Sequence, residues 1–345
     1  MTDAMRIDGV LRYQPGDPAS APREAKLAAE MGYDRLFTAE TAHDPFLPLA
    51  QAAQAADVDL GTYIAVAFAR NPMTTAVVAH DLQSFTGGRF VLGLGSQVKA
   101  HITRRFSMPW SHPAARMREF VLAMRAIWAS WQDGAPLNFT GEFYQHTLSS
   151  PIFDPGQTPF GPPKVLLAAV GPRMTEVAGE VADGLVCHAF TTRSYLAEVT
   201  LPTLRKAAVA AGRPPGDVEV ALPAFIATGP PGRDLTPKVE AVRKQIAFYA
   251  STPAYRGVLD HHGWGDLHTE LHRLSRDQRW DEMTKLVDDR VLQAFVVIAD
   301  ASGLAKALSR RFGGLVTSLN VGVPYAEDPD LWAPVIAALK NEPAP

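Results

Sequence analysis

The sequence predicts an α/β fold, a (β/α)8 TIM barrel formed by a single domain over residues 1–345. Three observations support this prediction. Short apolar runs typical of strands alternate with longer amphipathic runs typical of helices. Such a strict alternation indicates parallel strands joined by helical crossovers. The chain offers about eight strand–helix units, which is the number that closes this kind of barrel.

Eight segments have the composition of strands. They are residues 6–11, 33–38, 59–67, 89–94, 164–169, 184–187, 218–227 and 315–321. The third is almost entirely apolar, as expected of a strand covered on both faces. An open doubly wound sheet is the alternative. It is disfavoured because no Gly-x-Gly-x-x-Gly motif follows the first strand.

Helices are expected between these strands. They are residues 23–31, 48–56, 72–85, 113–131, 172–181, 193–211, 280–290, 302–312 and 329–339. Asn71 and Pro72 stand in the order of an N-cap and a first helical residue. A small hairpin is expected over 137–144. Residues from about 229 to 280 are rich in Pro, His and Trp and have weaker periodicity, which predicts an irregular insertion or lid.

Composition excludes several classes of function. Lys plus Arg is 33 and Asp plus Glu is 36, so the net charge of −3 argues against a general nucleic-acid binder. The single cysteine, Cys187, cannot form an internal disulfide or a zinc site of several thiolates. No metal site is expected, because the histidines of the insertion lack a regular set of carboxylate partners. We expect a cytoplasmic protein without membrane contact, since no signal peptide or membrane-length apolar run is present.

The active site of a barrel lies at the carboxyl ends of its strands. His43 and His188 follow two of these strands, and an imidazole there can donate or accept a proton. A structural hydrogen-bonding role is the alternative for each. Asp44 either orients His43 or caps the turn before Pro45. Cys187 is interpreted as a small strand residue, because its apolar flank raises the thiol pKa.

Two glycine-containing turns also lie at strand ends. Gly171-Pro172-Arg173-Met174 joins a strand to a helix, and its free N–H groups suit a phosphate, with Arg173 adding charge. An ordinary helix cap is the alternative. Gly93 and Gly95 would allow close approach to a flat ligand, or would form a plain tight turn.

Several stretches, taken in their order and spacing, resemble the luciferase-like monooxygenase superfamily across nearly the whole chain. The stretches are residues 60–72, 88–95, 116–119 with 127–128, 139–144 and 178–184. Within this superfamily, residues 94–101 are similar to the branch that uses the deazaflavin coenzyme F420. The resemblance implies a barrel with an insertion, often dimeric, so a homodimer is expected. It also implies a non-proline cis peptide at about residues 62–65, against which the cofactor ring lies.

The resemblance implies cofactor contacts in three places. They are Thr62, Ile64 and Ala65; Gly95, Ser96, Gln97 and His101; and Ala169, Val170, Gly171, Arg173 and Met174. The sugar-phosphate dehydrogenases of the branch carry an adjacent acid–His pair after the second strand. Here Glu40-Thr41 is the nearest match and His43 is displaced. The lysines that bind the sugar phosphate are also missing, so that substrate is not expected.

These observations predict an oxidoreductase that transfers a hydride between F420 and a small organic substrate. His43 is the expected proton donor or acceptor, with Glu40 and His188 as alternates. A deazaflavin reacts poorly with oxygen, which favours a dehydrogenase or reductase. The alternatives are an FMN-dependent monooxygenase served by a separate flavin reductase, and a cofactor-binding protein without catalysis. A barrel hydrolase is disfavoured because Glu40 and Asp44 lie on one loop.

Overall fold

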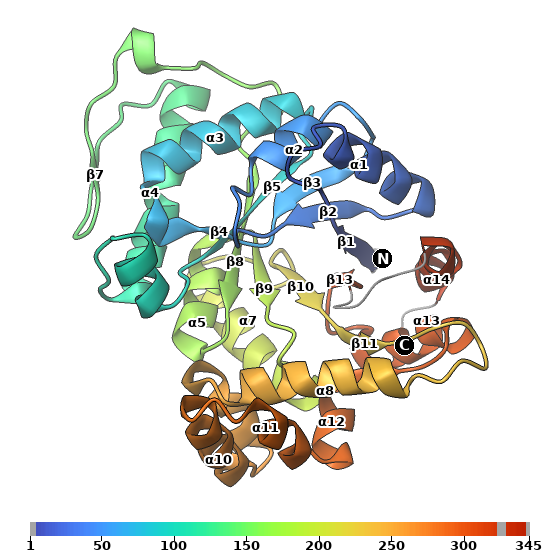
Figure 1. Ribbon diagram of the computed structural model, residues 1–345. Helices are drawn as coiled ribbons and strands as arrows, with labels where there is room; N and C mark the ends of the chain where they lie inside the picture. Colours follow the sequence, from blue (N-terminus) through green and yellow to red (C-terminus); the bar gives the residue numbers. More distant parts are fainter. Residues whose placement is uncertain (1–4, 323–328, 343–345) are drawn as a thin grey trace.

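A computed structural model describes residues 5–322 and 329–342 and contains a closed barrel of parallel strands surrounded by helices (Figure 1). The ring runs β1-β2-β3-β5-β8-β9-β10-β13 and closes where β13 pairs with β1. These eight strands are the eight predicted from sequence. The strands are β1 (Arg6–Val10), β2 (Arg35–Thr38), β3 (Asp59–Thr62), β4 (Ala65–Val66), β5 (Phe90–Gly95), β6 (Phe139–Thr140), β7 (Gln145–His146), β8 (Lys164–Ala169), β9 (Gly184–Cys187), β10 (Glu219–Pro223), β11 (Phe225–Ala227), β12 (Val296–Ile298) and β13 (Ser318–Asn320).

Outside the insertion, the helices follow the strands in the alternation that the sequence predicted. They are α1 (Ser20–Met31), α2 (Leu47–Ala52), α3 (Pro72–Phe85), α4 (Pro113–Asp133), α5 (Pro172–Val181), α6 (Arg193–Tyr195), α7 (Leu201–Ala210), α8 (Thr236–Ala250), α9 (Arg256–His261), α10 (Gly265–Arg276), α11 (Trp280–Leu286), α12 (Asp289–Phe295), α13 (Ala301–Phe312) and α14 (Pro329–Asn341). Asn71 caps α3 as predicted, since its side chain accepts a hydrogen bond from the Thr74 N–H. None of the helices among the described residues has the length and apolar character needed to cross a membrane.

Two predicted strands are interrupted. The third divides into β3 and β4 around a cis peptide bond between Tyr63 and Ile64. The seventh divides into β10 and β11. β10 stays in the ring beside β13, and β11 leaves the ring to pair with β12. The sequence did not predict β12, which has only three residues and therefore too little pattern.

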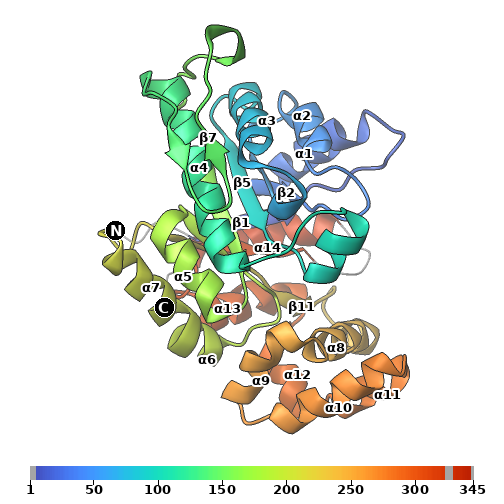
Figure 2. The ribbon, with the colours of Figure 1, turned by 90° about the vertical axis from the view of Figure 1, so that its left-hand side faces the viewer.

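The segment 229–280 was expected to be irregular, and this expectation is wrong. It holds α8, α9, α10 and the start of α11, grouped with α12 on one side of the barrel, in orange in Figure 2. Three of these helices, α9, α11 and α12, have only six or seven residues, which is too short to show a helical period. They bury a core of their own that includes Ile246, Leu259, Leu271 and Phe295.

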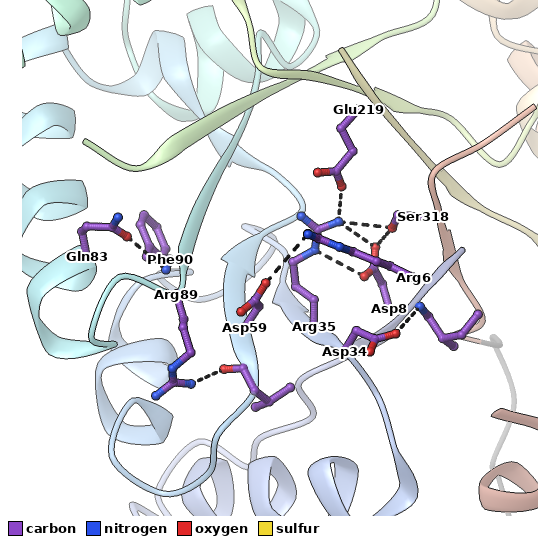
Figure 3. A network of polar contacts seen from close by, with 12 residues as sticks. Arg6, Asp8, Asp34, Arg35, Asp59, Gln83, Arg89, Phe90, Glu219 and Ser318 are labelled. Carbon is purple, nitrogen blue, oxygen red and sulfur yellow. Dashed lines mark hydrogen bonds and ion pairs between the residues drawn. The ribbon is translucent and has the colours of Figure 1, made fainter. Parts of the chain in front are cut away.

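Inside the barrel lie a charged network and a separate apolar cluster. Arg35 on β2 donates to both carboxylate oxygens of Asp8 on β1, at 3.3 and 3.2 Å, and also bonds Glu219 on β10. Ser318 on β13 bonds Asp8 as well, so the network joins four strands (Figure 3). Burial raises the pKa of Asp8, although the Arg35 charge opposes this effect. The layer of Val91, Leu166 and Val186, with Tyr63 and Ala168 beside it, forms a separate apolar cluster.

Candidate active site

The break in the third strand is held by Glu40, which follows β2. The Glu40 N–H donates to the Ile64 carbonyl at 3.0 Å. Its carboxylate accepts from the Val66 N–H at 2.7 Å and from the Arg70 guanidinium at 2.6 Å. The cis bond lies inside the stretch 62–65 that the resemblance implied. Glu40 holds the backbone on its far side through hydrogen bonds to Ile64 and Val66.

The strands β3 and β5 approach each other closely, and this approach involves Thr62, Gly93 and Gly95. The Thr62 hydroxyl donates to the Gly93 carbonyl at 2.7 Å and accepts from its N–H at 3.0 Å. A side chain at Gly93 would overlap the Thr62 carbonyl, and one at Gly95 would come within 2.8 Å of Ile64. Both glycines lie within β5 and not in a tight turn. The close fit of the strands requires both glycines, and the expected approach of a flat ligand stays a prediction.

The loop after β5 carries Ser96, Gln97 and His101. The Ser96 hydroxyl donates to the Gln97 carbonyl at 3.1 Å, and the Gln97 amide oxygen accepts from the Val98 N–H at 3.0 Å. Gln97 has a left-handed backbone, with φ of 59°. His101 is exposed and begins a π-helical turn, His101–Arg105. A hydrogen bond from Arg105 to the Thr41 carbonyl links this turn to the loop after β2.

The turn between β8 and α5 leaves the start of α5 open. Gly171 is the N-cap, and no side chain caps the helix, so the first-turn N–H groups are available to a ligand. A Cβ at Gly171 would meet no atom within 4 Å. Arg173 is exposed, Val170 and Met174 are half-buried, and Ala169 ends β8 as a buried residue. An open helix N-terminus of this kind suits an anion.

His188 follows β9 and is packed by the insertion. Its ring lies 4.5 Å from the rings of Tyr249 and Tyr255, measured between centroids. The Phe190 N–H donates to its Nδ1 at 3.0 Å, so the neutral ring carries its proton on Nε2. Burial lowers the pKa of His188 to about 4, and the ring is therefore neutral at physiological pH.

His43 lies on the exposed loop after β2. Its ring stands edge-on to Tyr13, with centroids 6.2 Å apart, and it makes no hydrogen bond within residues 5–322 and 329–342. Asp44 accepts from the N–H groups of Phe46 and Leu47 and pairs with Arg70. Of the two roles considered for Asp44, capping is therefore confirmed.

Sequence reasoning missed the residues that the insertion brings to this end of the barrel. Tyr249 and Tyr255 contact His188 but come from α8 and from the 3₁₀ turn Pro253–Tyr255. No local signal marks them, because the contact joins segments more than 60 residues apart. Arg70 follows the third strand and could have been recognised as a cation facing Glu40. Among the described residues, no cluster of three or more His, Cys, Asp or Glu side chains could hold a metal ion.

Comparison with known proteins identifies the class to which this fold and site belong. The luciferase-like monooxygenase family matches residues 3–318, so the chain belongs to this family of enzymes. The family prediction is thereby confirmed.

Among relatives, an uncharacterized protein of Mycobacterium tuberculosis (strain ATCC 25618 / H37Rv) is 50% identical, over 90% of this chain and 91% of that protein. A putative coenzyme F420-dependent oxidoreductase of the same strain is 26% identical, over 95% and 97%.

Solved structures of the same fold come from both cofactor classes. The coenzyme F420-dependent tetrahydromethanopterin reductase of Methanopyrus kandleri has a TM-score of 0.74 at 19% identity, covering 98% of each chain. The oxygenating constituent of 3,6-diketocamphane monooxygenase of Pseudomonas putida, in complex with FMN, has a TM-score of 0.66 at 16% identity, covering 99% of this chain and 98% of that one. At such identities the likeness establishes the fold, and the (β/α)8 prediction is confirmed.

Proposed function

We propose that the protein is an F420-dependent oxidoreductase that transfers a hydride between this deazaflavin and a small organic substrate. The observation that carries the proposal is the open first turn of α5 at the carboxyl end of the barrel. No side chain occupies this N-terminus, and Gly171 leaves space in front of it. The relative that is 26% identical along nearly the whole chain is described as a putative F420-dependent oxidoreductase, which supports the same cofactor.

The residues at the barrel mouth suit the cofactor. The N–H groups of Gly171, Arg173 and Met174 would hold its phosphate, and the Arg173 side chain would add a charge. Thr62, Ile64 and Ala65 would back its ring, and Ser96, Gln97 and His101 would flank its side chain. When bound, F420 supplies the hydride chemistry, and the chain supplies orientation and proton transfer.

Three side chains at the barrel mouth could carry the proton. Glu40 is 7% exposed at its side chain and is paired with Arg70. His188 has its Nδ1 engaged by a backbone N–H. His43 is exposed and free of hydrogen bonds among the described residues, so it can exchange a proton with solvent and substrate. We therefore assign the proton to His43 in this proposal.

A binding titration tests the cofactor. The protein should bind F420 with a lower Kd than FMN, as read from quenching of tryptophan fluorescence. Equal or tighter binding of FMN would contradict the proposal and would favour a monooxygenase served by a separate flavin reductase. A panel of alcohols and ketones with bound F420 then separates an enzyme from a protein that only binds the cofactor.

The assembly and the location also stay proposals. We infer a homodimer from the family resemblance and a cytoplasmic location from the sequence pattern, and sedimentation of the purified protein would check the dimer.

A further inference from the structure

A cavity with three arginines lies outside the ring of strands, where α13 meets β12 and the start of α6 (Figure 2). Its volume of about 560 Å³ is within the usual range for a site that holds a small ligand. Its lining residues are Arg193, Val296, Val297, Ile298, Ala307, Arg310 and Arg311. None of them is acidic, and none is among the residues proposed above for the cofactor or the proton. The cavity is therefore separate from the candidate active site.

Arg311 is held at the cavity wall by backbone carbonyls and not by an acid. Its Nη1 donates to the Val296 carbonyl at 2.8 Å, and its Nη2 donates to the Gln293 carbonyl at 2.9 Å. Within residues 5–322 and 329–342, its Nε has no partner and no carboxylate pairs with it. Burial lowers the pKa of Arg311, because no neighbouring negative charge offsets the loss of water. An anion in the cavity would supply this missing charge.

Arg193 and Arg310 add two further cations to the same cavity. Both side chains are exposed, and neither forms an ion pair with an acid in the described part of the chain. Elsewhere on the surface, Arg256, Arg273 and Arg279 each pair with an acid three or four residues away. Three positive charges that share one cavity repel each other, so an anion with more than one negative charge would stabilise the group.

The rest of the cavity wall is apolar. Val296 and Val297 are buried, and Ala307 is half-buried. Ile298 is 43% exposed although it lies on strand β12, so its side chain offers a surface that a ligand can cover. A ligand that fits this wall has an apolar part beside its charged group.

We propose that this cavity is a second ligand site, which binds a small molecule with a phosphate monoester group and a compact apolar body. A phosphate monoester carries about −1.5 to −2 charges at pH 7 and has three strong acceptor oxygens. The planar guanidinium groups of arginines match such oxygens in two-bond contacts. A single carboxylate would leave more of the positive charge unpaired. The site does not depend on the proposed cofactor.

Phenyl phosphate is the probe, and inorganic phosphate and benzyl alcohol separate the contributions of its two parts. Isothermal titration is made with the cofactor-free protein at low salt. We expect phenyl phosphate to bind about tenfold more tightly than inorganic phosphate, because the ring is buried against the apolar wall. Benzyl alcohol should bind more weakly than either. Added salt should weaken the binding of phenyl phosphate, since the contacts are ionic and partly exposed.

The start of α5 also suits a phosphate, so the same titration is made with Gly171→Asp, in which a carboxylate blocks that turn. We expect this variant to bind phenyl phosphate with the affinity of the unchanged protein. Loss of phenyl phosphate binding in this variant would place the ligand at α5 and would overturn the proposal.

Arg193→Gln and Arg310→Gln test the cavity itself. Each should lower the affinity for phenyl phosphate by roughly tenfold, the usual effect of losing one hydrogen bond between charged groups. Both side chains are exposed, so the melting temperature of the free variants should not fall. Arg276→Gln is the matched control, because Arg276 is an exposed arginine near the end of α10 and does not line the cavity. It should keep the affinity.

The proposal is overturned if phenyl phosphate does not bind, if benzyl alcohol binds equally well, or if the affinity is unchanged in both cavity variants. None of these measurements uses F420. Failure of the F420 titration together with success here would remove the proposed cofactor and leave the arginine-lined site standing.

Discussion

At the residue scale, the two histidines of the barrel mouth have opposite surroundings. His43 is exposed on a loop, whereas His188 is enclosed by two tyrosines and accepts a backbone hydrogen bond. Burial holds His188 neutral by lowering its pKa to about 4. Sequence position alone made both candidates for proton transfer, and only their packing distinguishes them.

His43→Ala should lower turnover by about 10²- to 10⁴-fold, the range of general acid–base catalysis, and should barely change F420 affinity. The pH profile of kcat should also lose one limb, because the group that carries the proton is removed. If His43 had a structural role, its removal would instead lower the thermal stability and leave the pH profile unchanged. A pH series of turnover and a thermal melt of this variant distinguish the two roles. An unchanged pH profile would mean that another group carries the proton.

His188 should make the protein less stable in acid. Burial lowers its pKa from 6.5 to about 4, so below pH 6.5 the unfolded chain takes up a proton that the folded chain refuses. The free energy of unfolding therefore falls between pH 6.5 and 4, by at most roughly 3 kcal/mol. His188→Gln should lose this part of the pH dependence in urea titrations at pH 7 and 4.5. His43→Gln, with an exposed ring, should keep it.

At the element scale, the start of α5 combines an open N-terminus with an unobstructed Gly171. Gly171→Asp should place a carboxylate in front of the first-turn N–H groups, where it both caps the helix and repels a phosphate. We expect F420 affinity to fall at least tenfold while the melting temperature is kept, because a Cβ there meets no atom within 4 Å.

Gly216→Asp is the matched control, since Gly216 is equally unobstructed but lies in the turn before β10. Isothermal titration with F420 and a thermal melt of both variants give the comparison. Unchanged affinity in Gly171→Asp would mean that the phosphate binds elsewhere.

At the scale of the whole molecule, the buried network links strands from both ends of the chain. Arg35 is fully buried and pairs with Asp8 and Glu219, so Arg35→Met should leave Asp8 as an unpaired buried acid and cost about 3–5 kcal/mol of unfolding free energy. Arg23→Met is the control. It removes an exposed ion pair with Asp17, whose N–O distance of 3.1 Å is close to the 3.2 Å of Arg35 and Asp8, and it should cost less than about 1 kcal/mol of unfolding free energy. Denaturant unfolding of the two variants measures the difference, and equal losses would show that the network does not stabilise the barrel.

The sequence by itself determined the barrel. The hydrophobic periodicity of a strand or a helix is visible within a short stretch of sequence, and the alternation of the two types allows only a few chain topologies. Residues 72–85, 164–169, 172–181 and 184–187 have the bounds that their patterns predicted. The last predicted strand, 315–321, is shorter in the structure, where β13 spans Ser318–Asn320.

Only the tertiary structure decided which polar side chains remain available for chemistry. The Glu40 carboxylate is occupied by hydrogen bonds from the Val66 N–H and from Arg70. The His188 ring is neutral because Tyr249 and Tyr255 cover it. The insertion supplies both tyrosines from more than 60 residues away. Burial and hydrogen bonding across such distances are set by packing, and no local pattern records them.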